Sequence, residues 1–226
     1  MSLPNPENEI ILQEEINNLI NNLYLSPMEY SLACINKLKD MQKINNLSLI
    51  NSIVLALLFA INEEWKLMQI EIKRASFNYE LNEKYKELLN LNLICKNFQN
   101  SPFTSLYSEI NFLEKCKDNN ISITAGVFSE VYERKQMEFL SKLFITLGEQ
   151  EFMLYFRPKY NNITDLQQKY DLKISEGYVY LKEKNYDYGR LHKSLENLEF
   201  VNKNTNLLEN NVKANPYTFN FPGEAI

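Results

Sequence analysis

Residues 48–79 read SLINSIVLALLFAINEEWKLMQIEIKRASFNY, and apolar side chains recur through them at alternating intervals of four and three. This spacing returns an apolar residue to the same helical face at every turn, as a heptad repeat does. The segment therefore predicts a helix with a buried stripe over roughly three and a half repeats. The stripe consists of Val54, Leu58, Ile61, Trp65, Met68, Ile72, Ala75 and Tyr79.

A second apolar stripe follows on a shifted helical face. The shift near Asn78 is compatible with a bend, or with one long helix that changes its packing partner. No glycine precedes Gly126 and no proline lies between Pro27 and Pro102, although strand-rich domains depend on both residues for their turns. Long helices are therefore expected. The second stripe consists of Phe77, Leu81, Tyr85, Leu88, Leu91, Cys95 and Phe98.

Helix-start signals divide the region around these stripes. Asn5-Pro6 and Ser26-Pro27 each place a capping residue before a proline, which the first helical turn tolerates. Glu29 stands three residues after Ser26 and completes a capping-box pattern. We expect helices from residue 6, from residue 26 to about residue 44, and from Ser101-Pro102 to about residue 117.

Residues 118–148 predict a loop followed by a further helix. Asp118-Asn119-Asn120 is interpreted as the loop, Thr124 as the helix cap and Gly148 as the residue that ends the helix. The small residues of 122–126 could hold a phosphate, but such cradles usually need several glycines and a lysine. We therefore interpret this segment as part of a plain loop.

The C-terminal third has weaker signals. Residues 151–157 suit either a strand or a short buried helix, and Asn162 is expected to cap another short helix. Residues 174–200 resemble one tetratricopeptide repeat, through Gly177, Tyr180, Asn185, Tyr186 and Gly189. The resemblance implies a helical hairpin, although Lys193 and Glu196 stand where the repeat has apolar and small side chains. A solenoid needs about three repeats and no second copy is found, so no family is assigned. A two-stranded β interpretation of residues 177–191 is the alternative.

An aromatic tail ends the chain. From Asn202 the sequence is polar, and Tyr217, Phe219 and Phe221 then alternate with polar residues. This period of two is typical of an extended segment with one apolar face. We predict that these three residues bind a partner protein or a second copy of the chain, and packing on their own domain is the alternative.

These patterns predict a mainly α fold, built as a multi-helix bundle with long antiparallel helices. The bundle is expected over residues 1–148. A helical hairpin or small α+β region over residues 149–201 is expected to pack against it, followed by an extended tail over residues 202–226.

Composition narrows the classes of function. The net charge of −5, with no basic block, gives no electrostatic support for nucleic-acid binding. The longest apolar run, residues 53–61, is far shorter than the roughly 20 residues of a membrane-spanning helix. The N-terminus has neither the basic start nor the apolar run of a secretory signal. Cys34, Cys95 and Cys116 are widely spaced and suit buried, reduced thiols, so a cytoplasmic location is expected.

Few residues qualify as candidates for chemistry. His192 is the only histidine, so a transition-metal site and histidine catalysis are not expected. Glu63, Glu64 and Glu71 lack the Glu-x-x-His partners of di-iron bundles, and we expect them on the solvated shoulder of a packed helix. Trp65 suits a bundle core, with a ligand cavity as the alternative.

Three functional hypotheses follow, none with a predicted catalytic, cofactor or metal residue. The first is a non-enzymatic structural or interaction subunit of a larger assembly, such as a virus particle or bacterial complex. The second is a helical regulator or adaptor that binds a peptide or small ligand in a cavity walled by Trp65, Met68, Phe139 or Phe144. The third is a histidine-free enzyme whose carboxylates converge on Mg²⁺.

Overall fold

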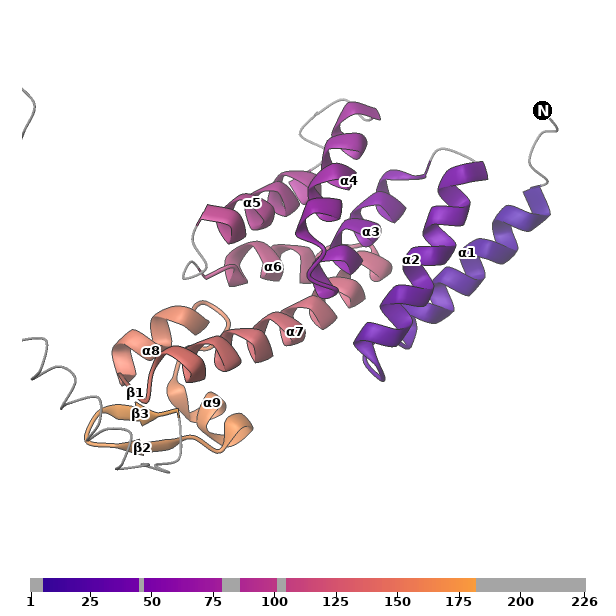
Figure 1. The fold of residues 1–226 in the computed structure, drawn as a ribbon. Coiled ribbons are helices and arrows are strands. Elements are labelled where there is room, and N and C mark those ends of the chain that lie inside the picture. Colours follow the sequence, from indigo (N-terminus) through magenta and orange to yellow (C-terminus); the bar gives the residue numbers. More distant parts are fainter. Residues whose placement is uncertain (1–5, 45–46, 79–85, 101–104, 182–226) are drawn as a thin grey trace, which may run out of the picture. The chain divides into compact units, whose positions relative to one another are not determined.

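The computed structural model describes residues 6–44, 47–78, 86–100 and 105–181 (Figure 1). These residues form nine helices and three short strands, so the predicted mainly α fold is confirmed. The helices are α1 Pro6–Asn21, α2 Pro27–Ile44, α3 Leu49–Ile61, α4 Trp65–Asn78, α5 Lys86–Asn100, α6 Tyr107–Glu114, α7 Asn119–Leu143, α8 Glu149–Phe156 and α9 Ile163–Tyr170, and the strands are β1 Thr146–Gly148, β2 Lys173–Ser175 and β3 Tyr178–Tyr180.

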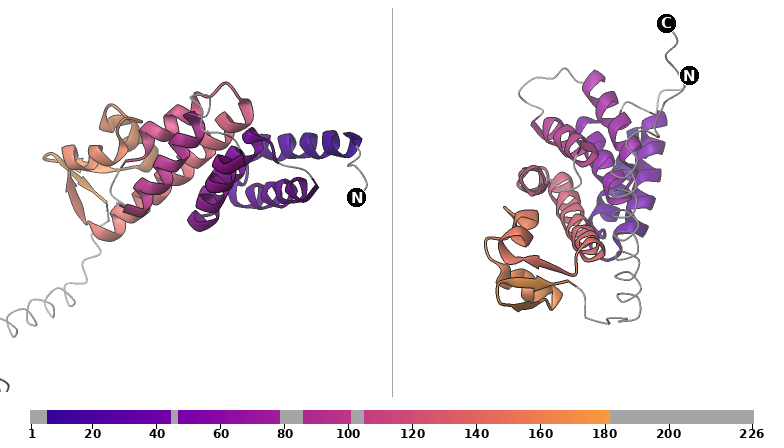
Figure 2. Two further views of the ribbon diagram at one scale, coloured as in Figure 1. Left: turned by 90° about the horizontal axis from the view of Figure 1, so that it is seen from above. Right: turned by 60° about the vertical axis from the view of Figure 1, so that its left-hand side comes forward.

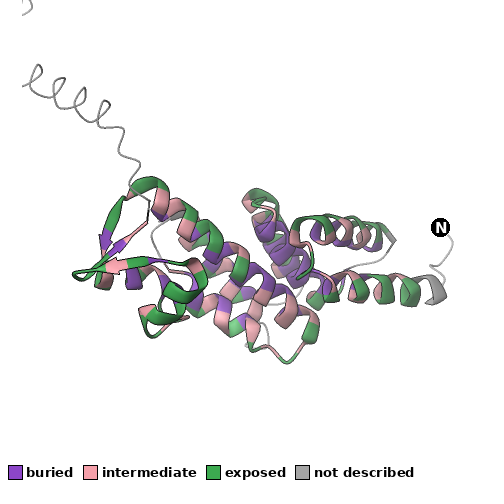
Figure 3. Cartoon of the chain, turned by 90° about the horizontal axis from the view of Figure 1, so that it is seen from below, coloured by how far each residue is buried: buried purple, intermediate pink, exposed green. Residues whose placement is uncertain are grey.

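Helix α3 lies at the centre of the bundle. Every residue from Asn51 to Ile61 is buried, as expected for a helix that is apolar on almost all sides (Figure 3). It contacts α2, α4, α5 and α7. The helix begins at Ser48, whose hydroxyl accepts a hydrogen bond from the Asn51 backbone N–H at 3.2 Å.

The prediction of one continuous helix through the first stripe is wrong, because the chain turns between α3 and α4. The N–H of Glu64 donates to the Phe59 carbonyl at 2.8 Å, and the N–H of Glu63 donates to the Ala60 carbonyl at 3.1 Å. These two bonds form a Schellman motif, in which the residue after the cap adopts a left-handed conformation. That residue is Glu63, with φ of 61°.

The second predicted stripe is divided in a similar way. Helix α4 ends at Asn78 and α5 begins at Lys86, with residues 79–85 outside the described ranges. Phe77 is 92% exposed and does not belong to the buried stripe. Leu88, Leu91 and Cys95 of α5 are buried as expected.

Helices α1 and α2 pack against each other and agree with the predicted starts at residues 6 and 26. Their buried faces include Ile16, Ile20 and Leu38. The predicted helix after Ser101-Pro102 is shorter than expected, because α6 covers only Tyr107–Glu114.

Helix α7 extends the bundle toward the C-terminal elements and contacts α1, α3 and α6 (Figure 2). Its cap is Asp118, whose carboxylate accepts hydrogen bonds from the N–H groups of Asn120 and Ile121. The assignment of the cap to Thr124 is wrong. Thr124 is buried inside the helix and donates to the Asn120 carbonyl at 2.7 Å. The expected loop over residues 122–126 is therefore helix.

A three-stranded antiparallel sheet, α8 and α9 follow the C-terminal end of α7 (Figure 1). The strand order is β1-β3-β2, with Leu147 opposite Val179. Gly148 therefore lies in β1 rather than at the end of α7, which corrects its assignment. Residues 151–157 belong mostly to α8, and α9 follows Asn162 as predicted.

The helical hairpin implied by the tetratricopeptide resemblance is wrong over residues 174–181. Strands β2 and β3 are joined there by Glu176 and Gly177, with φ of 53° and 79°. Two such residues between antiparallel strands are typical of a type I′ hairpin turn. The remainder of the repeat-like segment lies outside the described residues.

The chain divides into two compact units, residues 1–182 and 183–226. All the elements above belong to the first unit. The boundaries predicted at residues 148 and 201 stay predictions.

Candidate ligand-binding pocket

A pocket of about 260 Å³ lies where the α3–α4 junction, α5 and α7 meet. Its wall is aromatic. The rings of Trp65 and Phe98 stack with centroids 3.7 Å apart and planes 18° apart. Phe128 meets Trp65 edge to face, at a centroid distance of 6.3 Å. The Schellman turn positions Trp65 here, because α4 begins immediately after the chain reverses at Glu63 and Glu64.

One polar group of the pocket lacks a hydrogen-bond partner in the described part of the chain. Gln136 is only 4% exposed, and its Nε2 has no acceptor within hydrogen-bonding distance there. A buried N–H group without a partner costs about 1–3 kcal/mol. Nε2 is itself fully buried, so a ligand acceptor reaches this unpaired donor when the Gln136 side chain turns toward the pocket that it lines.

The mouth of the pocket carries two ion pairs. The Lys135 ammonium contacts the Glu63 carboxylate at 2.6 Å, which joins α7 to the turn after α3. The Lys142 ammonium contacts the Glu138 carboxylate at 2.7 Å along α7. These contacts raise the pKa of Lys135 and lower the pKa of Glu138. All four side chains are more than half exposed, so the mouth opens to solvent with balanced charge.

Tyr132 is, with Gln136, a buried polar side chain of the wall. It is 6% exposed, and burial raises its pKa to about 12. Its ring meets that of Tyr107 edge to face at 5.3 Å, so it links the pocket to the buried rings of α6.

A different part of α7 holds a buried carboxylate. Glu133 is 0% exposed and receives the ammonium groups of Lys159 and Lys169, each at 2.7 Å. The hydroxyls of Tyr160 and Tyr170 donate to the same carboxylate at 3.0 and 2.8 Å. Burial acts to raise the pKa of Glu133, but the hydrogen bonds from both lysines and Tyr170 outweigh it and hold that pKa below its ordinary value. The carboxylate is enclosed by its partners, so this cluster joins α7 to the C-terminal elements and is not open to a substrate.

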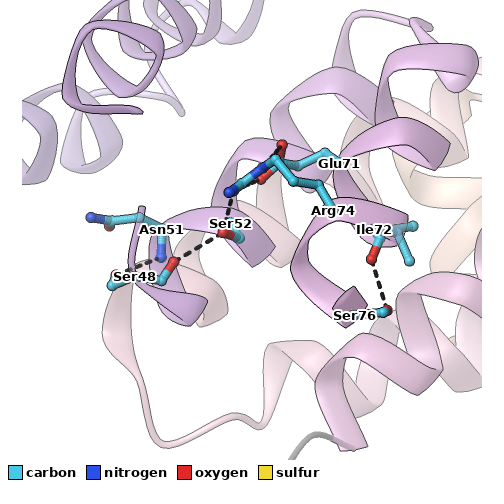
Figure 4. Close-up of polar contacts among 7 residues, drawn as sticks. All are labelled: Ser48, Asn51, Ser52, Glu71, Ile72, Arg74 and Ser76. Atoms are coloured by element: carbon cyan, nitrogen blue, oxygen red, sulfur yellow. Dashed lines mark hydrogen bonds and ion pairs between the residues drawn. The ribbon is translucent and has the colours of Figure 1, made fainter. Parts of the chain in front are cut away.

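A second buried ion pair corrects the expectation for Glu71. Its side chain is buried instead of lying on a solvated shoulder, and its carboxylate accepts from Arg74 Nε at 2.9 Å. Arg74 also donates to the Ser52 hydroxyl at 2.8 Å, and Ser52 donates to the Ser48 carbonyl (Figure 4). This network attaches α4 to the first turn of α3. Glu63 and Glu64, in contrast, are exposed as expected.

The structure brings together part of the cavity wall suggested by the sequence. Trp65 and Phe139 line the pocket, whereas Met68 is fully buried and, like Phe144, is not part of the lining. Gln136 was not anticipated. The signal that could have indicated it is a glutamine in the apolar face of α7, four residues after Tyr132 and four before Leu140.

The remaining candidates are placed as follows. Cys34 and Cys95 are buried as predicted, and Cys116 is half-buried. Burial raises the pKa of Cys34 to about 12. The predicted partner-binding residues Tyr217, Phe219 and Phe221 lie outside the described residues, as does His192. In the described ranges, no three His, Cys, Asp or Glu side chains are grouped so as to hold a metal ion.

Comparison of the chain with protein-family models, curated protein sequences and solved structures gives no match. Within the described ranges, no helix has both the length and the apolar character needed to cross a membrane.

Proposed function

We propose that this chain is a non-catalytic binding protein of the regulator or adaptor class, in which the pocket beside α7 receives an apolar group. The observation that carries the proposal is the buried amide of Gln136, which lines an aromatic pocket and has no acceptor in the described part of the chain. A ligand that supplies a hydrogen-bond acceptor would remove the free-energy cost of the unpaired Gln136 amide, and its apolar surface would cover the aromatic wall.

The chemistry of the lining favours binding over catalysis. A general acid or base works best with a pKa near the working pH. Burial moves the pKa of Tyr132 to about 12, and the contact with Glu63 raises the pKa of Lys135, so neither group is brought toward neutrality. The lining instead resembles the usual ligand site, which has apolar walls and a few fixed polar groups.

The test is a binding screen read by nuclear magnetic resonance. Trp65 is the only tryptophan of the chain, so its indole N–H gives a unique signal inside the pocket. We expect neutral aromatic compounds to shift this signal in a saturable way. Val131→Phe, which fills the pocket, should abolish the shift. Met137→Phe, on the same helix but outside the lining, should leave it intact. Failure of every compound to bind, or equal binding to both variants, would refute the proposal.

The assembly-subunit hypothesis stays a second proposal. It is favoured by three exposed apolar side chains near the start of α2. Leu25, in the turn before the helix, is 76% exposed, and Met28 and Leu32, on the helix, are 54% and 50% exposed. Light scattering should compare the full chain with two variants, one in which Leu25, Met28 and Leu32 are serine and one in which Tyr217, Phe219 and Phe221 are serine. An oligomer that either variant converts to a monomer supports assembly through the changed residues, and a monomeric full chain contradicts the proposal.

A further inference from the structure

Building on the proposed function, we infer that the pocket ligand is a neutral, planar, two-ring aromatic molecule with a carbonyl oxygen that accepts a hydrogen bond from Gln136. The inference combines the size of the pocket, the geometry of its wall, the position of its amide and the charge at its mouth.

The volume limits the size of the ligand. An apolar protein cavity of about 150 Å³ accommodates one benzene ring. The pocket measures about 260 Å³, so it has room for two fused rings with a small substituent. Extended drug-sized ligands occupy pockets of about 300–1,000 Å³ and would project into solvent.

The wall favours an aromatic ligand over a branched aliphatic one. Trp65 and Phe98 are nearly parallel, and Phe128 meets Trp65 edge to face. Aromatic pairs prefer these two arrangements and gain about 0.5–1.5 kcal/mol beyond the area that they bury. A planar ligand can continue either arrangement, because Trp65 and Phe98 are only half-buried.

Gln136 determines the polar group of the ligand. Its unsatisfied atom is Nε2, a donor, so the complementary group is an acceptor. An apolar ligand without an acceptor would leave the N–H groups enclosed and unpaired. A hydroxyl could serve as acceptor, but it would also bring an O–H donor that needs its own partner, and a carbonyl brings none.

The mouth favours a neutral ligand. Lys135 and Lys142 are already paired with Glu63 and Glu138, so the positive charges at the mouth are compensated. An anionic ligand would have to displace a carboxylate to gain a lysine. It would also lose its hydration on entering an aromatic pocket.

The experiment uses two matched probes, 1-indanone and indane, which share their fused rings and differ in the carbonyl, and indane-1-carboxylate as a third, charged probe. The full-length protein is titrated with each probe, and the Trp65 indole N–H and the Gln136 side-chain amide are followed by magnetic resonance. We expect 1-indanone to bind about 3- to 10-fold more tightly than indane, as one net hydrogen bond provides. The Gln136 amide should shift with 1-indanone only.

Gln136→Met is the decisive variant, because it keeps the length of the side chain and removes the donor. The preference should reverse, with the more apolar indane binding at least as tightly as 1-indanone. Gln150→Met, an exposed change on α8, is the control and should keep the wild-type preference.

Equal affinities for the two probes in the wild type would overturn the inference but leave the proposed function intact. Tighter binding of indane-1-carboxylate than of 1-indanone would overturn the inference that the ligand is neutral. Absence of binding by all three probes would overturn the inference, and the broader compound screen then decides the proposed function separately.

Discussion

Replacing Glu133 with glutamine removes the negative charge from a fully buried carboxylate that contacts two ammonium groups. The side chain keeps its shape, so the change isolates charge and hydrogen bonding. Removing one partner of a buried ion pair typically costs 3–5 kcal/mol, because the other charge stays behind without compensation. Lys159 and Lys169 are 24% and 44% exposed and can turn partly toward water, so we expect the lower end, about 3 kcal/mol.

This loss depends on pH in a direction that follows from the lowered pKa of Glu133. A carboxyl group with a lower pKa in the folded state stabilises the fold above its unfolded pKa. That stabilisation is lost as the pH falls from the ordinary value of 4.5 through the folded value. The difference between the wild type and Glu133→Gln should therefore be complete at pH 7 and shrink below pH 4.5, where protonated Glu133 resembles glutamine.

Urea unfolding followed by circular dichroism measures this difference at each pH, and urea, being uncharged, does not screen the ion pairs. At pH 7 the melting temperature should also fall by about 6–12 °C. Glu138→Gln is the matched control, because it removes a carboxylate from an exposed pair on the same helix and should have no measurable effect. The reasoning is refuted if the two variants behave alike at pH 7, or if the effect of Glu133→Gln persists undiminished in acid.

Three further outcomes are expected, the first two read from urea unfolding. Arg74→Ala should destabilise the fold by about 3 kcal/mol, because the buried carboxylate of Glu71 loses its partner. Replacing both Glu71 and Arg74 by leucine should cost less than this single change. A double variant less stable than Arg74→Ala would contradict the reasoning. Asp118→Ala should cost about 1 kcal/mol through the lost cap of α7, whereas Asp118→Asn should retain most of the stability. Native protein treated with iodoacetamide at pH 8 should react at half-buried Cys116 well before Cys34, whose pKa is raised to about 12 by burial, and mass spectrometry of digests would reveal the opposite order.

The presence and approximate location of the helices could be predicted from the sequence, because they depend on local signals. Low glycine content and apolar periodicity indicated the helices, and Ser26-Pro27 marked the start of α2. The break between α3 and α4 could not be predicted, because Ile61 and Trp65 keep the spacing of an uninterrupted helix. The residue in the left-handed position is Glu63, where glycine would have indicated the turn. The short loop before α7 also conceals its cap, since Asp118 and Thr124 are both good capping residues.

The candidate site was predictable only in part, because it depends on contacts between distant segments. Trp65, Phe98 and Gln136 come from three separate helices, and periodicity on each helix says only that a face is buried. The burial of Glu71 likewise depends in part on a side chain from outside its own stretch of sequence. Its position beside an apolar stripe suggested exposure, but Arg74 and Ser52 compensate the burial of its charge.

The cluster around Glu133 also sets an order for folding during synthesis. Its most distant partner, Tyr170, lies 37 residues later in the chain. At translation rates of about 5–20 residues per second, the ribosome needs roughly 2–7 s to add that interval. Tyr160 follows Glu133 by 27 residues and Tyr170 by 37, so the set of partners is complete only at the end of this interval, and its part of α7 cannot close fully against the C-terminal elements before then. The pairings of α1 with α2, of α2 with α3 and of α3 with α4 involve only earlier segments, and we expect them to form before the C-terminal elements close on α7.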